Sequence, residues 1–564
     1  MSIKYARSAL FSQNQLDEFF KEKLFEKFVG GTITYDDFLL KIRCNIKSNF
    51  LNNRFNKELV KHWNVLISDL LVDTDLVISN KKNNDIMKAL FSYIYRATLN
   101  AEYGNLYGFV SRVNRQVVSS SSNVELKIIR NEYRDWNAQF HINPTICYSN
   151  GFMYFFKYEN SREEIKRIPL KIDDYNNLIA ELKIGNDLPR DKFEKYCRIG
   201  LFTKPISYKD IYDLINTNSL DFCIDETVLQ QQMNSLNKYL TQEHEYMVKE
   251  KEMLKSLVEV AVQKNNGPIL LVEFLAHYCT EILNIREARS KNLKKYNENV
   301  YEKCEKKEIY FSVRKKENGS IDAVILNNAS PFKIFSSRLE AVFNDITEIE
   351  NNHYHINFYP MHSLLYHTSR INLKNENKSI AINYDVSDAI RVGELFLSVK
   401  NGKIVICHDG KEITPMYLST YNVNNSVILV FLRMISDIQE EFYLPRPEMT
   451  YDVQVTYYKE KQFDGIVVQP ARWSVPAKLI PMCKSSICNE EFFRYFITLR
   501  NEYDIPRFVY AYDDNTIDYK RIIDFYNPYS VSQLKKYKEG NEIYFEELSI
   551  PPKDELATQY LWQD

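Results

Sequence analysis

The chain has 564 residues, of which 45% are hydrophobic, and a formal net charge of −2. This length predicts roughly three to four domain-sized units with an ordinary buried core. Because the charges nearly balance, the chain is not a polycation, and any contact with nucleic acid must come from a local basic patch.

The N-terminal segment, residues 1–15, has neither an apolar core of signal-peptide length nor a small-residue cleavage site. The sequence also contains no run of about 18 apolar residues that would span a membrane. Nine cysteines are scattered without a framework spacing, which favours reduced thiols. We therefore predict a cytoplasmic protein.

Three segments between residues 12 and 100 carry apolar side chains at spacings of three and four, which predicts helices. They are residues 16–29, 33–46 and 84–99.

The pattern changes near residue 142 to short strands. Thr145–Tyr148 and Phe152–Tyr158 flank the tripeptide Ser149-Asn150-Gly151, which predicts a hairpin. Short helices are predicted to follow at residues 173–183 and 208–217, among further short strands. A compact unit with a hairpin and helices of this size is typical of a winged-helix module.

Two long helices are predicted next, at residues 227–264 and 269–307, because the stop signal Asn265-Asn266-Gly267-Pro268 separates them. Beyond them the chain is mostly strand-like, with one further helix at residues 490–503. The predicted strands are residues 308–315, 354–360, 379–384, 395–399, 403–408, 451–458, 465–470, 508–512 and 542–548.

Helix-rich and strand-rich blocks follow one another without a regular βαβ alternation, so we predict an α+β fold with several domains. The blocks are an N-terminal helical part, a winged-helix-like module, a long-helix segment and a strand-rich C-terminal half, at residues 1–142, 143–225, 226–310 and 311–564.

Four histidines, His353, His355, His362 and His367, lie close together in the sequence. Metal sites usually include a carboxylate or cysteine in register with such histidines. We therefore favour surface and half-buried histidines over a metal site, and predict no metal.

A basic stretch at the end of the second long helix includes Arg289, Lys294 and Lys295. Such a patch could contact a phosphate backbone. Interspersed glutamates are also typical of a solvated helix face, and charge alone favours that second interpretation.

Four groups of short motifs together carry a family resemblance through their order along the chain. They are residues 5–10 (YARSAL), residues 93–107 (YIYRATLNAEYGNLY), residues 369–372 (SRIN) with 410–415 (GKEITP), and the series 444–447, 469–473, 505–510 and 546–547. In this order they resemble the glutamylation region of the lanthipeptide and thiopeptide dehydratases, the LanB-like family.

The resemblance implies a glutamyltransferase that acts on a ribosomally made precursor peptide. Glutamyl-tRNA would be the co-substrate, Ser and Thr side chains the acceptors, and no cofactor is implied. The module at residues 143–225 would bind the leader peptide of the precursor as an added strand. Few residues follow Glu547, so the resemblance implies one half of a split dehydratase, with elimination left to a separate partner protein. Other enzymes of the pathway are further candidate partners.

The resemblance also implies site residues. Arginine suits the phosphates and the glutamyl carboxylate because its planar fork makes bidentate contacts with both anions. By resemblance, Arg7, Arg96 and Arg370 are the catalytic candidates, together with Asp135 as the acidic residue expected after the second motif. The candidates for substrate or tRNA binding are Asn100, Glu102, Arg289, Lys294 and Lys295.

The chain departs from the family pattern in its second motif. Asn100 stands where the family has an arginine, and Glu102 stands where it has a threonine. A carboxylate at this place repels an anionic substrate unless it is paired. Either the site is rebuilt, or this chain no longer performs the acyl transfer.

Two alternatives therefore stay open. A peptide–aminoacyl-tRNA ligase would extend the peptide C-terminus through an amide bond and would need ATP. A non-catalytic scaffold would keep the peptide-binding module and recruit partner enzymes, and the altered Asn100 and Glu102 are its main support.

Overall fold

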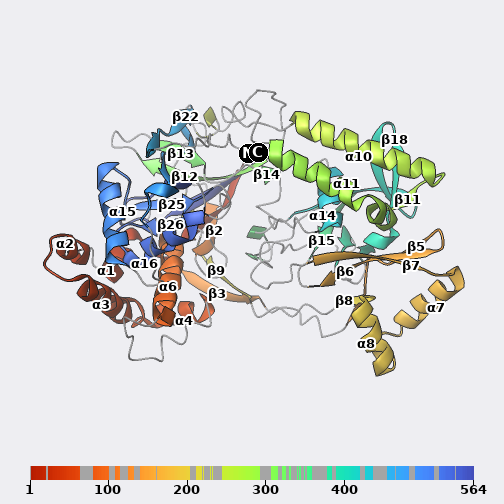
Figure 1. Ribbon diagram of the computed structural model, residues 1–564, viewed down its shortest axis with the longest axis horizontal. Helices are drawn as coiled ribbons and strands as arrows, with labels where there is room; N and C mark the ends of the chain where they lie inside the picture. The colour runs from red at the N-terminus through yellow and green to blue at the C-terminus, as the bar shows by residue number, and fades with distance from the viewer. Residues whose placement is uncertain are drawn as a thin grey trace.

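The computed structural model places most of the chain in two lobes, which Figure 1 shows side by side. The structure describes residues 2–20, 23–63, 81–100, 108–114, 125–131, 140–159, 162–203, 211–218, 220–221, 229, 231–232, 244–292, 307–315, 321–325, 330–331, 339–340, 342–343, 349, 352–358, 378–383, 389–418, 426–435, 454–463, 465–481, 489–513, 520–539 and 542–563. In these ranges no helix is both long and apolar enough to cross a membrane.

Helices near the N-terminus pack on one side of the first lobe. They are α1 (Gln13–Phe20), α2 (Lys23–Val29), α3 (Tyr35–Asn45) with its π-helical extension η1 (Ile46–Phe50), α4 (Arg54–Trp63) and α6 (Lys81–Leu99). Thr34 caps α3, because its hydroxyl accepts a hydrogen bond from the Asp37 amide at 3.1 Å. The helices predicted at 33–46 and 84–99 are confirmed, while the segment predicted as one helix at 16–29 holds parts of two helices, α1 and α2.

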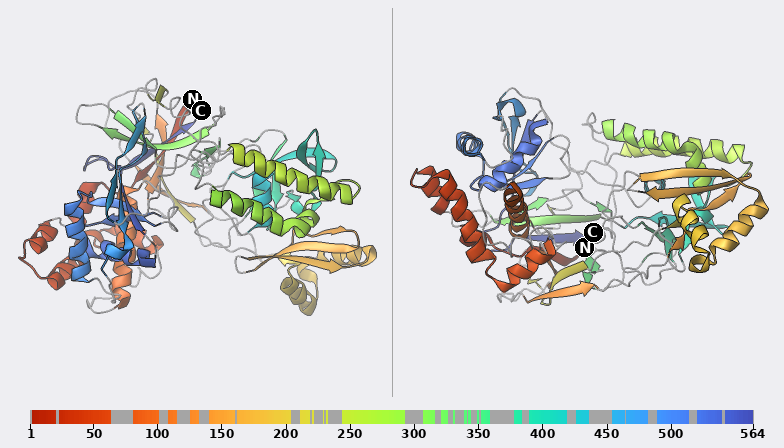
Figure 2. Two further views of the ribbon diagram at one scale, coloured as in Figure 1. Left: turned by 45° about the horizontal axis from the view of Figure 1, so that its top comes forward. Right: turned by 60° about the horizontal axis from the view of Figure 1, so that its bottom comes forward.

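A large mixed sheet crosses the first lobe. Its strands, in spatial order, are β22 (Lys461–Phe463), β23 (Ile466–Gln469), β13 (Ile321–Ile325), β12 (Lys307–Lys315), β28 (Thr558–Gln563), β1 (Ser2–Ala9), β2 (Gly108–Asn114), β9 (Ile211–Asn216) and β3 (Leu126–Asn131), with β10 (Leu220–Asp221) on β2 and β14 (Ser330–Pro331) on β12. Strands from the two ends of the chain, β1 and β28, are antiparallel neighbours near its middle. Figure 2 accordingly shows the two termini together in both views.

Two sequence predictions are wrong in this sheet. Residues 1–142 were expected to be helical, yet β1, β2 and β3 fall within them. The helix predicted at 208–217 is β9, which pairs with β3 along its whole length and with β2 at one end. Over so short a segment the apolar residues fit a helical and an alternating pattern equally well. The long-range pairing with β3 and β2 makes the segment a strand.

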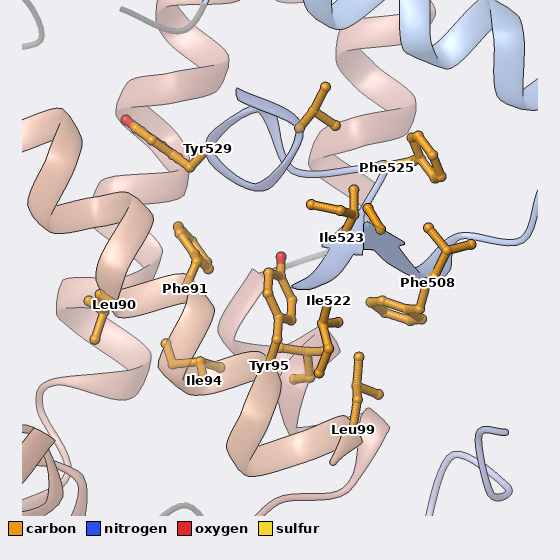
Figure 3. Close-up of a cluster of buried hydrophobic side chains, with 14 of the residues drawn as sticks. Leu90, Phe91, Ile94, Tyr95, Leu99, Phe508, Ile522, Ile523, Phe525 and Tyr529 are labelled. Carbon is orange, nitrogen blue, oxygen red and sulfur yellow. The ribbon is translucent and has the colours of Figure 1, made fainter. Parts of the chain in front are cut away.

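A second sheet completes the first lobe. Its strands, in order, are β21 (Thr456–Tyr458), β24 (Arg472–Pro476), β27 (Glu542–Glu547), β25 (Phe508–Tyr512) and β26 (Arg521–Asp524). The helical elements beside it are α15 (Glu490–Glu502), α16 (Pro528–Val531), η7 (Ala477–Leu479) and η8 (Ser532–Glu539). Figure 3 shows Phe91 and Tyr95 of α6 packed toward Tyr529 and Ile522, so α6 joins this sheet through a shared apolar core.

The second lobe contains another sheet under two long helices. Its strands, in order, are β11 (Ile269–Leu270), β18 (Phe396–Lys400), β19 (Lys403–His408), β20 (Lys411–Met416), β15 (His353–Asn357), β16 (Ser379–Ala381) and β17 (Ile390–Arg391). Its helical elements are α10 (His244–Lys264), α11 (Leu271–Asn292), α14 (Val427–Ile435) and η6 (Val392–Glu394). The predicted break at 265–268 is confirmed. The described part of the second helix runs to Asn292, and Lys307, predicted as the last residue of that helix, begins β12 instead.

The predicted hairpin is also confirmed, in a small three-stranded sheet. The module consists of β4 (His141–Ile142), β5 (Cys147–Ser149), β6 (Phe152–Glu159), β7 (Arg162–Pro169), α7 (Ile172–Leu182), η3 (Gly185–Asp187), α8 (Arg190–Ile199) and β8 (Phe202–Thr203). Asn150 and Gly151 form the turn with φ of 50° and 80°, as a tight primed turn requires. One sheet face packs on α11 and the other on α7 and α8. The α+β class is thus confirmed, while the winged-helix assignment stays a prediction.

Candidate functional site

Arg7 lies on β1, between β2 and β28, with Val110 and Gln559 as its cross-strand partners. Its Nε donates a hydrogen bond to Oε1 of the buried Gln559. Its Cζ also lies 3.9 Å from the centre of the Tyr310 ring, on β12. An amide and an aromatic ring therefore hold this guanidinium in one orientation.

Neither of these partners of Arg7 carries a charge. Among the residues that the structure describes, no carboxylate pairs with its guanidinium, which is only half-buried. A fixed, partly desolvated cation with donors left over is suited to bind a carboxylate or a phosphate. Arg7 is therefore the candidate anion-binding residue that its sequence motif predicted.

Aromatic rings and a second arginine share this face of the sheet. Tyr5 points to the same side as Arg7 and stands opposite Arg112 of β2. Arg112 lies over the Phe343 ring, with Cζ 4.9 Å from its centre, and Phe343 stacks on Tyr5 at 5.9 Å. The other sheet face carries Phe109, part of the core that includes α6. The face with Arg7 thus carries Arg7 and Arg112 beside a buried apolar cluster that includes Tyr5, Val110 and Leu339.

Arg96 lies in the last turn of α6, close in space to the end of β1. The carbonyl oxygen of its neighbour Ala97 accepts hydrogen bonds from the amides of Leu10 and Phe11, at 2.7 and 3.1 Å. The Asn100 amide in turn donates to the Arg96 carbonyl at 3.2 Å. The first two sequence motifs, almost ninety positions apart in the chain, therefore meet through backbone hydrogen bonds.

The remaining predicted site residues cannot be placed beside Arg7. Arg289 belongs to α11 in the second lobe, and its side chain lies outside the described part of the protein. The other candidates outside the described residues are Glu102, Asp135, Lys294, Lys295 and Arg370. Their roles stay predictions. Tyr310 and Gln559, in contrast, were missed by sequence reasoning, because only the pairing of β1, β12 and β28 brings them to Arg7.

Parts of the fourth group of motifs lie in the five-stranded sheet, around a buried arginine, while residues 444–447 lie outside the described residues. Arg472 of β24 pairs across the ladder with Glu546 of β27, and its Cζ lies 4.5 Å from the centre of the Tyr458 ring. Glu546 also accepts hydrogen bonds from Tyr512 at 3.1 Å and Lys520 at 2.5 Å. Burial, and then the Glu546 charge, raise the pKa of the Tyr512 hydroxyl. These motif residues hold the sheet together.

His355 is one of the four histidines that were considered as metal ligands in the sequence. It lies on β15 with 2% of its surface exposed. Burial lowers the pKa of its imidazole to about 4, although a hydrogen bond with the Met416 backbone acts to raise it. His355 is therefore a neutral core residue. Within the described ranges, no group of three or more His, Cys, Asp or Glu side chains could hold a metal ion.

A second candidate site is the edge of β7. Among the described residues β7 pairs only with β6. The Leu170 amide donates to Gly151 at 3.0 Å, toward the β6 side. Because successive amides of a strand point to opposite sides, the amides of Ile165 and Arg167 face the open edge. Such an edge can accept an added peptide strand.

Comparison with known proteins gives matches among solved structures. No family model matches the sequence, and neither does any curated protein. The TbtB glutamylation domain from thiomuracin biosynthesis is similar at 10% identity with a TM-score of 0.59, and coverage is 100% of both chains. The same domain bound to 5'-phosphodesmethylglutamycin gives a TM-score of 0.60 at the same identity and coverage.

The tRNA-dependent lantibiotic dehydratase MibB from Microbispora sp. 107891 is similar as well. Its TM-score is 0.61 at 10% identity, and coverage is 100% of this chain and 68% of that chain. At such low identity the likeness establishes the fold alone. The family resemblance predicted from the motifs is thereby confirmed at the level of the fold: the chain folds as the LanB-like glutamylation domains do.

Proposed function

We propose that this protein transfers the glutamyl group of glutamyl-tRNA to Ser and Thr side chains of a ribosomally synthesised precursor peptide. The observation that carries the proposal is the likeness to glutamylation domains along the whole chain, with coverage of 100% on both sides for TbtB. The order of the sequence motifs supports it independently, because that order does not depend on the fold.

The chemistry asks for positioning rather than for an additional activating group. The Ser or Thr oxygen forms an ester bond to the glutamyl carbonyl carbon, and the bond from that carbon to the terminal ribose oxygen of the tRNA breaks. The hydroxyl proton ends on that ribose oxygen. One ester replaces another, so no ATP is consumed in this step, and rate is gained by aligning the two reactants and stabilising the oxyanion.

Arg7 is the residue to which we assign anion recognition in this reaction. Its guanidinium is fixed by Gln559 and Tyr310 and has no carboxylate partner among the described residues. In this proposal Arg7 binds either the glutamyl carboxylate or a phosphate next to the ester. Arginine can hold each of these anions with two donors. Arg112 adds positive charge to the same face.

The peptide substrate is assigned to the edge of β7. An incoming leader segment would pair with the outward amides of Ile165 and Arg167 and extend the sheet β5–β6–β7 by one strand. Glu163 anchors β7 to the second lobe, because its carboxylate accepts hydrogen bonds from Ser426 at 2.9 Å and from the Val427 amide at 2.6 Å. The edge is thus presented on a fixed support.

Elimination of glutamate is assigned to a separate protein. The chain resembles glutamylation domains, so glutamylation is the step that we assign to it, and the expected product of that step is the glutamylated peptide.

Reconstitution tests the proposal directly. The purified protein is incubated with the precursor peptide encoded beside its gene, glutamate, its tRNA and the cognate synthetase, without any elimination protein. The expected result is a peptide whose mass rises by whole glutamyl units, attached through base-labile esters to Ser or Thr. An unmodified peptide that still binds the protein tightly would favour the scaffold suggested by Asn100. A base-stable amide at the C-terminus would favour the ligase.

A further inference from the structure

A buried carboxylate lies where the hairpin of the module at residues 143–225 meets the two long helices of the second lobe. Glu273 of α11 is 3% exposed, and its Oε1 accepts a hydrogen bond from the Asn150 Nδ2 at 3.1 Å. Asn150 lies in the turn between β5 and β6, and its Nδ2 also donates to the Asn265 Oδ1 at 3.3 Å. Asn265 donates in turn to the Pro268 carbonyl at 2.9 Å. The hairpin turn is thus joined both to α11 and to the turn that precedes it.

The Glu273 carboxylate also acts on two strands of the hairpin. Burial, and then the Glu273 charge, raise the pKa of the Cys147 thiol on β5. The same two causes, in the same order, raise the pKa of the Tyr154 hydroxyl on β6. That hydroxyl lies 3.4 Å from Nε2 of His277, one turn further along α11. Figure 1 shows the three-stranded sheet beside α11, and these polar contacts lie in the same interface as the apolar packing.

Only one oxygen of Glu273 is paired within the part of the chain that the structure describes. Its Oε2 is buried and has no hydrogen-bond partner among those residues. Val272 and Phe274 beside it belong to a buried apolar cluster. A half-paired carboxylate in such surroundings costs free energy, and an apolar side chain of similar volume would stabilise the interface more. Net stability therefore does not account for Glu273, and the remaining contribution of its hydrogen bond is direction.

That direction is given to the strand edge assigned to the peptide. Apolar packing between the module and α11 is non-directional and does not by itself fix how the module is oriented. The Glu273 hydrogen bond holds the hairpin turn, and the Leu170 amide donates to the Gly151 carbonyl of that turn at 3.0 Å. At its other end β7 is held by Glu163, which accepts from the Val427 amide at 2.6 Å. The open edge of β7 is thus fixed at both ends.

We propose that Glu273 is a positioning residue of the glutamyl transfer. It holds the module in one orientation, so that a leader peptide bound at β7 brings its Ser and Thr side chains to the transfer site at one fixed place. The inference rests on the proposed function and adds to it a residue that touches neither reactant. A peptide held by a fixed anchor reacts at a high effective concentration, which falls when the anchor can turn.

Variants of the full-length protein test the Asn150–Glu273 hydrogen bond from both sides. Glu273→Met replaces the carboxylate by an apolar side chain of similar volume. Asn150→Gly removes the donor, and glycine adopts the φ of 50° at this position without strain. Glu273→Gln is the conservative variant, because its amide oxygen still accepts from Asn150. The matched control, Glu252→Met, changes an exposed glutamate of α10.

The kinetic readout is the split between kcat and KM for the precursor peptide. We expect Glu273→Met and Asn150→Gly each to lower kcat about tenfold and to leave KM unchanged, because the anchor loosens while the β7 edge stays intact. Their double variant should be no worse than either alone, since both remove one hydrogen bond. Glu273→Gln and Glu252→Met should keep wild-type kcat. Wild-type kcat in both Glu273→Met and Asn150→Gly overturns the inference.

Two further measurements distinguish positioning from a purely structural role. Affinity for the isolated leader peptide, from fluorescence anisotropy, should equal wild type in every variant. The Tm of Glu273→Met should be unchanged or higher, because a half-paired buried carboxylate is removed. A fall of both Tm and leader affinity together with kcat would show that Glu273 only supports the fold, and it would overturn the inference.

Hydrogen exchange separates a failure of this inference from a failure of the proposed function. The amides of β5 and β6 next to the turn should exchange faster in Glu273→Met than in wild type, because the hairpin opens locally more often. If wild-type protein forms no glutamyl ester, the transfer is excluded, and faster exchange with unchanged leader affinity still supports Glu273 as the residue that orients the module. If wild-type protein glutamylates the precursor and the variants match it in exchange and kcat, the function stands and Glu273 is excluded.

Discussion

The guanidinium of Arg507 lies against the carboxylate of Asp524, with Nε 3.0 Å from Oδ1 and Nη2 3.2 Å from Oδ2. Asp524 is fully buried, and its Oδ2 also accepts a hydrogen bond from the Tyr95 hydroxyl at 3.0 Å. The Arg507 Nη1 reaches Asp17 of α1 at 2.9 Å. The ion pair of Arg507 and Asp524 thus ties α1 and α6 to the five-stranded sheet.

Removing Arg507 should destabilise the first lobe strongly. Arg507→Gln leaves the buried Asp524 carboxylate without its cation, so we expect the free energy of unfolding to fall by about 3–5 kcal/mol. Urea denaturation followed by circular dichroism measures this. The control is Arg494→Gln, whose exposed pair with Glu490 should contribute less than about 0.5 kcal/mol. Equal effects of the two substitutions would contradict the prediction.

Arg7 should affect catalysis far more than stability. We expect Arg7→Gln to lower kcat/KM for peptide glutamylation about a hundredfold or more, as removal of a desolvated charge partner does. Arg7→Lys should recover only part of the rate, because an ammonium lacks the planar pair of donors. Mass spectrometry of timed reactions gives the rates. Lys4→Gln, at an exposed position of the same strand, should leave them unchanged, and a fully active Arg7→Gln would exclude Arg7 from the site.

The open edge of β7 can be blocked at one backbone amide. Arg167→Pro removes an outward amide but none of the hydrogen bonds to β6, which an edge strand tolerates. We expect affinity for the leader peptide to fall roughly fivefold to tenfold, the value of about one hydrogen bond plus the steric obstruction. Fluorescence anisotropy measures the affinity.

Arg167→Ala is the matched control for this edge. It removes the guanidinium that lies 3.8 Å from the Phe152 ring centre while it keeps the amide. Affinity equal in the proline and alanine variants would show that the peptide does not pair with β7.

Buried His355 should make the fold sensitive to mild acid. Its pKa is about 4 in the folded protein and about 6.5 in the unfolded chain. The unfolded chain therefore takes up a proton first as the pH falls. His355 therefore leaves the free energy of unfolding unaffected above about pH 6.5. Between pH 6.5 and pH 4 its protonation in the unfolded chain lowers that free energy by about 3 kcal/mol.

Denaturation at several pH values tests this expectation. His355→Leu should lose about 3 kcal/mol less stability than wild type between pH 6.5 and pH 4, because leucine does not titrate. His277→Gln, at an exposed residue of α11, should keep the wild-type dependence. Parallel curves for wild type and His355→Leu would show that His355 is not responsible.

Local patterns predicted much of the fold. The helix α3, the turn at Asn150 and the break at Gly267 all depend on residues close together in the sequence, and all are found as predicted. The strand β9 was mistaken for a helix, because its six residues are too few for helical and alternating patterns to differ. Pairing with β3 and β2, which no local pattern records, decides its conformation.

The candidate site was predictable only in part, for the same reason. A motif drew attention to Arg7, but its orienting partners Tyr310 and Gln559 are hundreds of residues away. The assembly of a site from several strands is a property of tertiary structure, and the order of residues along the chain gives no direct sign of it.

The neighbouring strands β1 and β28 have a consequence for biogenesis. Pairing between residues separated by more than five hundred positions gives the first lobe a high contact order, which slows folding. During synthesis β1 leaves the ribosome long before β28 exists, and its open edge must be kept from other strands by chaperones or delay. The Arg7 guanidinium gains its orienting amide only when Gln559 has been translated, so the orientation of this cation is fixed late in synthesis.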